Sequence, residues 1–400
     1  MDKNIEKVGK KYSLPSPELL DCHDDENNQV NEASIQDAKD RLEKLLASLK
    51  IDAFVSAVHV GSRVTQFEIS PSPGVKVDRI KKIEDNIVMA LEAESIRIQA
   101  PIPGKNAVGI EVPNKVPNTV YLRPLLESKE WTSSKTAIPI LLGRNTQGKV
   151  AMFDLAKAPH LLIAGTVDSG KSVYMNTFIM SLLFRFSPDE LKFIMIDPKV
   201  IELEMYSSIP HLIMPVVNDP ERARLALQWA MDEVERRIMV LKKVKMKTLA
   251  GFNSRPPDPQ PILDDEGNVI PQRLPIIVVI VDELSDLMMS DAKNEVEMSI
   301  CRITQMGRAV GIHLVAMTSA TRKNVITCLV KANIPTKIAF RVIDSVSSRV
   351  VLDCSGAEKL LGAGDMLFNP SNGAKLERIQ GAYVSEEEVC KVIDAVSKNG

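Results

Sequence analysis

The sequence predicts an α/β protein in which a parallel, doubly wound sheet forms the larger part and a small α+β unit precedes it. Short apolar runs between helical stretches recur from about residue 138, and several are continuous, as in strands covered on both faces. One run leads directly into a glycine-rich phosphate-binding pattern. Strand–helix repeats connect by right-handed crossovers, which bring the loops after the strands to one sheet edge. The predicted strands are 161–164, 193–196, 276–281, 313–317, 338–340 and 366–368.

The preceding unit alternates helix and strand on a smaller scale. Its expected elements are a helix from Ser34, strands at 53–59 and 64–69, a Pro/Gly turn at 71–74 closing that hairpin, a helix near 83–91 and a strand at 96–99. We therefore divide the chain into a flexible acidic linker at 1–33, an α+β domain at 34–125 and a larger α/β domain at 126–400.

Two local patterns mark the later part of the chain. The proline-rich stretch at 251–275 is expected to be a surface loop before the strand at 276–281. Ser385 followed by Glu388 is a capping box, which predicts a last helix running to about residue 396.

Composition narrows the class of protein. The 400 residues exceed what one core usually needs, and the net charge of −2 excludes a protein that coats DNA with a basic surface. The five cysteines show no CxxC spacing, which favours reduced thiols and argues against a zinc site. No apolar run reaches the roughly 18 residues of a membrane helix, and the first residues lack a signal-peptide core, so we expect a cytoplasmic chain with no membrane segment of its own.

The clearest chemical signal is a match to G-x-x-x-x-G-K-[ST] between a predicted strand and a predicted helix. Glycines let the backbone wrap around phosphates, and amide N–H groups at the helix start point at the anion. The lysine would neutralise the β- and γ-phosphate oxygens, and the last serine would bind Mg²⁺. The pattern consists of Gly165, Thr166, Val167, Asp168, Ser169, Gly170, Lys171 and Ser172.

A second signal lies downstream, where the apolar run at 276–281 ends in Asp282 and Glu283. Such an acid pair after a buried strand resembles the Walker B element of nucleotide hydrolases. We expect Asp282 to hold Mg²⁺ together with Ser172, and Glu283 to polarise the attacking water.

Several further stretches, in one order, resemble the FtsK/SpoIIIE family of double-stranded DNA translocases from about residue 12 to 398. They include APIPGKNAVGIEVPN, LGRNTQGKVAMFDLAKAPHLLIAGT, IDPKVIELEMYSSIPHLIMPVV, VDELSDLMM, ITQMGRAVGIHLVAMTS, LVKANIPTKIAFRV and SGAEKLLGAGDMLF. The resemblance implies a RecA-like P-loop ATPase that uses ATP and Mg²⁺, with α and β motor domains and a homo-hexameric ring around duplex DNA.

The resemblance implies a role for Arg308, and two other sets of residues are candidates from the sequence itself. Arg308 occupies the place where related ring motors carry an arginine that reaches a neighbour's nucleotide; the alternative is a surface arginine on a helix. Asp197 and Lys199 follow the predicted strand at 193–196 and so lie on the same sheet edge. They either belong to the nucleotide site or form a helix cap and an ion pair. The densest basic stretch would contact DNA phosphates or form a solvated helix face, and it consists of Arg236, Arg237, Lys242, Lys243, Lys245 and Lys247.

The sequence departs from the family pattern at two site positions. Asp168 places a carboxylate where the phosphate-binding loop usually has glycine, and Ser319 stands where the family has a glutamine that senses the γ-phosphate. The family's N-terminal membrane domain and C-terminal winged-helix module have no counterpart in these 400 residues.

The resemblance, added to the two nucleotide-site patterns, implies an ATP-driven duplex-DNA translocase acting in chromosome segregation during cell division or sporulation, with Lys171, Glu283, Arg308 and Ser319 as its catalytic residues. The alternatives are a ring subunit that binds nucleotide but is impaired in hydrolysis, and a related ATPase that secretes protein. A small-molecule kinase would leave the first domain and the downstream blocks unexplained.

Overall fold

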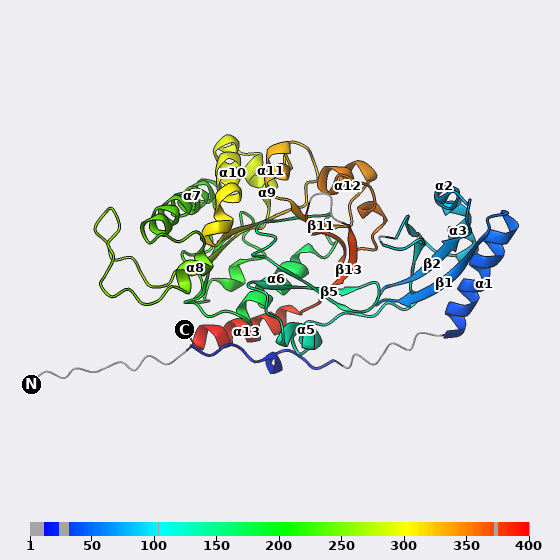
Figure 1. Cartoon of the computed structure of the whole chain (residues 1–400), viewed down its shortest axis with the longest axis horizontal. Coiled ribbons are helices and arrows are strands. Elements are labelled where there is room, and N and C mark those ends of the chain that lie inside the picture. The colour runs from blue at the N-terminus through cyan, green and yellow to red at the C-terminus, as the bar shows by residue number, and fades with distance from the viewer. Residues whose placement is uncertain (1–11, 24–31, 103, 372–374, 400) are drawn as a thin grey trace, which may run out of the picture.

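The computed structural model describes residues 12–23, 32–102, 104–371 and 375–399, which form a small unit and a larger one, each with its own sheet (Figure 1). The small sheet has four strands in the order β1-β2-β4-β3, and the large sheet has nine in the order β6-β5-β13-β12-β11-β7-β10-β9-β8. None of the described helices is both long and apolar enough to cross a membrane.

The small unit is an antiparallel sheet covered by helices. Its strands are β1 (Ala53–Val60), β2 (Val64–Pro71), β3 (Arg97–Gln99) and β4 (Val108–Pro113), and its helices are α1 (Glu32–Ser48), α2 (Val77–Lys81) and α3 (Glu84–Leu91). Side chains such as Ile69, Ile87 and Val108 are fully buried between the two layers.

One turn of this unit was predicted at the wrong place. The hairpin between β1 and β2 closes at residues 61–63, where Gly61 N–H donates to the carbonyl of Val64. The Pro/Gly turn at 71–74 instead leads from β2 into α2. Both stretches carry turn residues, and the antiparallel register of β1 with β2 leaves only three residues for the closing turn.

The large sheet combines parallel and antiparallel strands. Five strands run parallel, in the order β11-β7-β10-β9-β8, and they include the continuous apolar runs that predicted a buried sheet. The sheet is therefore mixed, because the other four strands extend it through antiparallel pairs; of these four, only β12 had been predicted, at 366–368. The bounds are β5 (Pro139–Asn145), β6 (Val150–Asp154), β7 (Leu161–Ala164), β8 (Leu191–Ile196), β9 (Ile276–Val281), β10 (Ile312–Thr318), β11 (Thr336–Phe340), β12 (Asp365–Asn369) and β13 (Glu377–Gly381).

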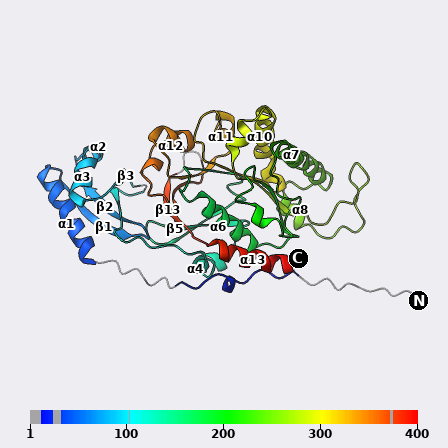
Figure 2. The ribbon, with the colours of Figure 1, turned by 180° about the vertical axis from the view of Figure 1, so that it is seen from behind.

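Helices cover both faces of this sheet (Figures 1 and 2). On β7, Leu161 and Ile163 point into one core and Leu162 and Ala164 into the other, as strand periodicity requires. The first core includes α4 (Leu122–Leu126), α5 (Lys129–Thr132), α6 (Lys171–Leu183) and α13 (Glu386–Asn399). The second includes α7 (Pro220–Lys243), α8 (Leu249–Asn253), α9 (Leu284–Met288), α10 (Lys293–Val310), α11 (Cys328–Asn333) and α12 (Ser345–Leu352).

The start of α13 has the predicted capping box. Ser385 N–H and Oγ–H both donate to the Glu388 carboxylate, at 2.8 and 2.9 Å, and Glu388 N–H donates to Ser385 Oγ at 3.2 Å. These bonds satisfy amide groups that have no partner within the helix.

Residues 12–23 differ from the flexible linker predicted for 1–33. They lie along the large unit beside α13, with Leu20 fully buried in the core and Asp21 paired to Lys391 at 2.9 Å. His23 stacks on Tyr121 with ring centroids 3.6 Å apart. One buried leucine and these polar contacts outweigh the acidic composition that predicted solvation. Residues 1–11 and 24–31 of the predicted linker lie outside the described residues.

Candidate active site

The glycine-rich loop joins β7 to α6 at the carboxyl edge of the parallel strands, as predicted. Gly170 has φ +103°, and a Cβ added there would lie 2.3 Å from the backbone nitrogen of Gly364. At Gly165 an added Cβ would lie 2.6 Å from Phe340 Cβ. Both positions therefore require glycine, one for its conformation and both for the close approach of neighbouring elements.

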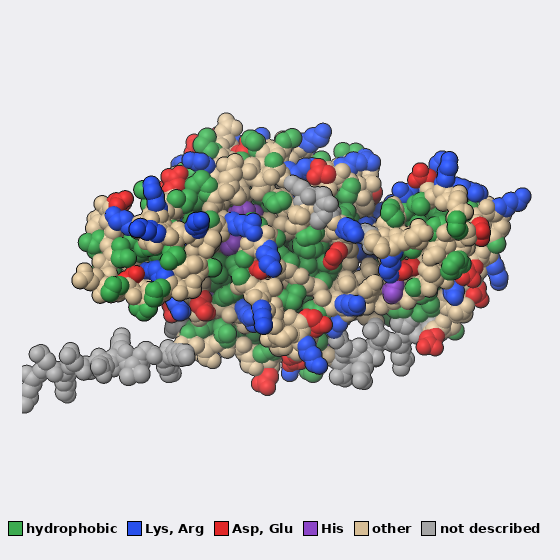
Figure 3. Space-filling view, in the orientation of Figure 1, with side chains coloured by type: hydrophobic (Ala, Val, Ile, Leu, Met, Phe, Trp, Pro, Cys, Tyr) green, Lys and Arg blue, Asp and Glu red, His purple; other side chains and the backbone are tan. Residues whose placement is uncertain are grey.

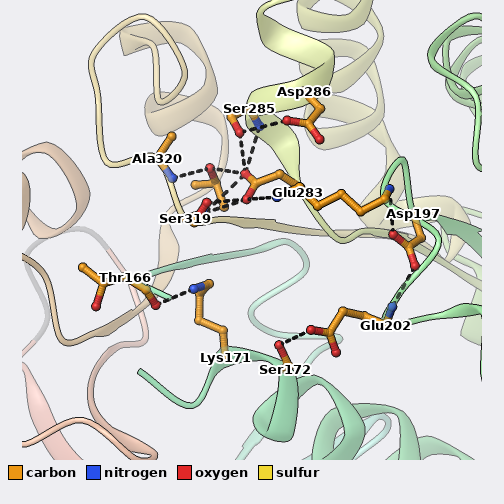
Figure 4. A network of polar contacts seen from close by, with 12 residues as sticks. Thr166, Lys171, Ser172, Asp197, Glu202, Glu283, Ser285, Asp286, Ser319 and Ala320 are labelled. Carbon is orange, nitrogen blue, oxygen red and sulfur yellow. Dashed lines mark hydrogen bonds and ion pairs between the residues drawn. The ribbon is translucent and has the colours of Figure 1, made fainter. Parts of the chain in front are cut away.

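Lys171 is the first residue of α6, and its side chain folds back over the loop. Its Nζ donates to the carbonyl of Gly165 at 2.9 Å. It also donates to the carbonyl of Thr166 at 2.7 Å, as Figure 4 shows. Burial lowers the pKa of Lys171, while the nearby Glu283 and Asp282 charges oppose that shift. The ammonium group is thus held beside the backbone amides where an anion would sit.

Asp168 adopts a left-handed backbone conformation with φ +60°. Aspartate tolerates this region better than most residues, although glycine adopts it without strain. Both Asp168 and Val167 are exposed at the rim of the loop, whereas Ser169 is buried and donates from Oγ to Thr166 at 2.6 Å. Water therefore screens the Asp168 carboxylate, which reduces its repulsion of a bound phosphate.

An open cavity of about 730 Å³ lies in front of this loop. Lys171, Ser172, Asp282 and Glu283 line it together with Ser319. Other parts of the chain complete the lining, which includes Arg63, 117–120, Ala363, Gly364, 380–382 and Tyr383.

Asp282 follows β9 and faces this cavity. It is 7% exposed, and its Oδ1 is buried without a hydrogen-bond partner among the described residues. Burial and the charges of Asp197, Glu202 and Glu283 raise its pKa to about 7. A buried carboxylate oxygen with no donor and excess negative charge around it is suited to a cation.

The residues around Asp282 fit Mg²⁺. Ser172 Oγ donates to Glu202 Oε1 at 2.7 Å, so a second carboxylate, which the sequence analysis missed, adjoins the predicted serine ligand. Among the described residues no group of three His, Cys, Asp or Glu side chains could hold a metal alone. That is the usual situation for Mg²⁺, which takes one or two carboxylates and completes its shell with phosphate oxygens and water.

Glu283 adjoins Asp282 but has full hydrogen bonding (Figure 4). Ser319 donates to it from Oγ at 2.5 Å and from N–H at 3.1 Å, and Thr318 Oγ1 and Ser285 Oγ each donate at 2.7 Å. Burial opposes ionisation, but these donors overcome it and lower the pKa of Glu283 to about 2. Ser319 therefore contacts the carboxylate directly, a role that the comparison with the family's glutamine did not suggest.

Asp197 and Lys199 have different roles: Asp197 holds a loop, and Lys199 lies at the cavity. The Asp197 carboxylate is fully buried and accepts five backbone N–H groups from residues 199–203 at 2.9 to 3.1 Å, which fixes the loop after β8. Lys199 instead lines the cavity, with its Nζ 3.6 Å from Glu283 Oε2.

Arg308 lies on the last turn of α10, exposed and outside the cavity lining. It is the one predicted catalytic residue that the fold does not bring to the site within this chain. An arginine acting from a neighbouring subunit would occupy such a surface position.

The basic stretch at the end of α7 contains one residue that cannot contact DNA. Arg237 is 1% exposed, binds Glu233 at 2.7 Å and donates to the carbonyls of Pro275 and Val310. Arg236 shares Glu233. Spacing along α7 places Arg237 on the buried face, so its inclusion was wrong, and Lys242, Lys243, Lys245 and Lys247 stay exposed. Figure 3 shows Lys and Arg side chains interspersed with acidic and hydrophobic ones on the face of the molecule in view.

Two family models match the chain, the FtsK/SpoIIIE family over residues 121–325 and the FtsK alpha domain over residues 14–114. The chain belongs to the FtsK/SpoIIIE family. Its relatives include the DNA translocase SpoIIIE of Bacillus subtilis, 46% identical over 98% of this chain and 49% of its own. The DNA translocase FtsK of Haemophilus influenzae is 44% identical over 95% of this chain and 74% of its own. The DNA translocase FtsK of Clostridium tetani is 43% identical over 97% of this chain. This chain spans about half of the length of that relative, 51%.

Solved structures confirm the predicted P-loop ATPase fold. The pCW3 conjugation coupling protein TcpA, in its monomer form with ATPγS, has a TM-score of 0.59 at 21% identity and covers 87% of this chain and 96% of its own. The cytoplasmic domain of the type VII secretion ATPase EccC of Thermomonospora curvata has a TM-score of 0.57 at 20% identity, covering 70% of this chain and 34% of its own.

Proposed function

We propose that this chain is the motor part of an ATP-driven double-stranded DNA translocase. The observation that carries the proposal is the convergence of Lys171, Ser172, Asp282 and Glu283 on one cavity in a member of the FtsK/SpoIIIE family. The first two come from the start of α6 and the other two from the end of β9, so the parallel sheet brings together segments more than 100 residues apart.

Each of these residues has a distinct part in the proposed hydrolysis. The backbone N–H groups of 165–172 and Lys171 bind the phosphates of ATP. Ser172 and Asp282 hold Mg²⁺, which supplies charge neutralisation of the phosphate oxygens. Glu283, oriented by Ser319 and Thr318, positions the attacking water. With a pKa of about 2 it orients water better than it accepts a proton.

The proposed assembly and cargo are based on the names of the relatives. Relatives are named DNA translocases, and we propose duplex DNA as the substrate, a homo-hexameric ring as the working form and chromosome segregation at division or sporulation as the process. In that ring Arg308 reaches the nucleotide of the neighbouring subunit. The exposed lysines at 242–247 contact DNA phosphates without reading sequence. We place this motor in the cytoplasm.

The test is steady-state ATP hydrolysis with and without long linear duplex DNA. We expect DNA to raise the rate, and Lys171→Ala to lower it by at least about 100-fold. The matched control is Lys157→Ala, an exposed lysine before β7 that should leave the rate unchanged. A DNA-independent rate that a protein substrate raises would replace DNA with protein as the cargo. Unchanged hydrolysis in folded Lys171→Ala would refute the site.

A second candidate function is a ring subunit that binds nucleotide and hydrolyses it poorly. The hydroxyl of Ser319, 2.5 Å from Glu283, favours it, since it holds the carboxylate in a fixed and weakly basic state. Asp168 adds a negative charge beside the phosphates. This candidate predicts tight ATP binding with little DNA-stimulated turnover, and restoration of turnover by Asp168→Gly combined with Ser319→Gln.

A further inference from the structure

The loop at 361–364 lies between the small unit and the phosphate-binding loop. Gly364 N–H donates to the carbonyl of Ser169 at 2.9 Å, and the backbone of Gly364 packs so closely on Gly170 that no Cβ fits between them. A shift of this loop therefore moves or releases the backbone that would cradle phosphates.

The loop has a backbone that needs support. Gly362, Ala363 and Gly364 have φ values of +77°, +46° and +89°. For alanine the left-handed region costs roughly 1–2 kcal/mol, so the conformation persists only where surrounding contacts hold it. One contact comes from the large unit itself, where Gln380 Nε2 donates to Ala363 O at 2.9 Å.

A second contact comes from the small unit. Arg63, in the turn between β1 and β2, donates from Nη1 to the carbonyl of Ala363 at 3.1 Å and of Gly362 at 3.4 Å. Its guanidinium stays charged at any working pH, and it lines the same cavity as Lys171. The buried Nε of Arg63 has no hydrogen-bond partner among the described residues.

A buried ion network gives the small unit a second connection to the same loop. Glu111 of β4 binds Arg378 of β13 at 2.8 Å, and Arg378 binds Asp365 at 2.6 Å. Asp365 accepts the N–H of Leu361 at 2.8 Å. Glu111 and Arg378 have side chains 1% and 3% exposed, so this network does not rearrange at small cost.

We propose that Arg63 is a positioning residue of the nucleotide site, which couples the docking of the small unit to the phosphate-binding loop through residues 361–364. Arg63 holds the loop, and the loop holds Ser169 and Gly170. Nucleotide binding then strengthens the contact of the β1–β2 turn with the large unit, and that contact raises nucleotide affinity by the same factor. The proposal rests on the proposed nucleotide site.

The experiment measures the affinity of the whole chain for a fluorescent ATP analogue with Mg²⁺. Arg63→Ala should weaken binding by at least about fivefold, the lower end of typical coupling between sites. Arg63→Lys, which keeps the charge but has fewer donors, should fall between wild type and Arg63→Ala. Arg79→Ala is the matched control, because Arg79 also binds backbone carbonyls of the small unit, those of Leu49 and Lys50, away from the cavity.

Hydrogen exchange provides the second readout, and its main arm, on the wild-type chain, needs no variant to fold. Adding the analogue should slow exchange in the β1–β2 turn and at 361–364, and this protection should be absent in Arg63→Ala. Unchanged affinity in a folded Arg63→Ala, or no protection of the turn by bound nucleotide, would overturn the proposal. Failure of the wild type itself to bind the analogue would instead refute the nucleotide site, and the coupling with it.

Discussion

Asp282 and Glu283 are neighbours in the sequence and lie on one cavity, yet their surroundings differ in kind. Asp282 has a buried oxygen without a donor and three carboxylates nearby, and its pKa rises to about 7. Glu283 is buried to a similar extent but accepts bonds from two residues of β10's end and from Ser285, and its pKa falls to about 2. Burial alone therefore does not set the pKa of a carboxylate; nearby charges and hydrogen-bond donors decide the direction of the shift.

The difference divides the cavity into two sides. The Asp282 side is suited to binding a cation, and on the other side hydrogen bonds keep the Glu283 carboxylate ionised and fixed in place. A cation at Asp282 would offset the repulsion from the nearby carboxylates, whereas the Glu283 carboxylate is already stabilised by its hydrogen-bond donors. The three predictions below test this division.

The largest effect is expected for Glu283→Gln. The amide keeps the size of the side chain but cannot orient water as a carboxylate does, so ATP hydrolysis should fall by about 10²–10⁴-fold. ATP binding should stay close to that of the wild type, since the phosphate-binding loop is unchanged. The measurement is single-turnover hydrolysis beside equilibrium binding. Loss of binding in parallel with hydrolysis would place Glu283 on the cation side after all.

A smaller effect is expected for Ser319→Ala. It removes a hydroxyl that donates to a buried carboxylate, so the free energy of unfolding should drop by about 1.5–3 kcal/mol. Ser290→Ala is the control, because Ser290 Oγ donates to the carbonyl of Leu287 and not to Glu283. Urea unfolding of both variants gives the comparison. Equal losses would show that Ser319 has no special hold on Glu283.

The smallest effect is expected for Asp282→Asn in the absence of nucleotide and Mg²⁺. Because the folded pKa of about 7 exceeds the ordinary aspartate value of 3.8, the wild type loses stability as pH rises from about 4 to about 7, and the loss is complete above that pH. Asn carries no charge, so the variant should be more stable than the wild type at pH 8, by up to a few kcal/mol, and the gain should shrink toward pH 5. Urea unfolding at several pH values checks this, and a gain that is constant with pH would contradict the raised pKa.

The sequence predicted the parts of the site that are local. Three local motifs were predicted: the phosphate-binding loop, the acid pair after β9 and the capping box at Ser385. Each depends on residues only a few positions apart, so the sequence pattern alone indicates its local structure. The same holds for the continuous apolar strands of the parallel sheet. Met175, Ile179 and Leu183, which follow one another at a helical spacing of four residues on α6, are buried.

The parts that the sequence did not predict depend on contacts between distant segments. Ser319 meets Glu283 across 36 positions, and Arg63 meets Ala363 across 300. Arg237 was assigned to a DNA surface because its neighbours are basic, but its face of α7 is decided by packing against Val310 and Pro275. Strands β5, β6 and β13 were not predicted, and the pairing of β13 with β5 joins segments that are far apart in the sequence.

The most direct test of the two-sided cavity is ATP affinity of the wild type and of Asp282→Asn, each measured with Mg²⁺ and with a chelator. If Asp282 holds the cation, the wild type binds ATP more tightly with Mg²⁺, the variant loses most of that gain, and the two are alike in chelator. If the variant keeps the full Mg²⁺-dependent gain, the cation is held elsewhere, and the division of the cavity proposed from Asp282 and Glu283 is wrong.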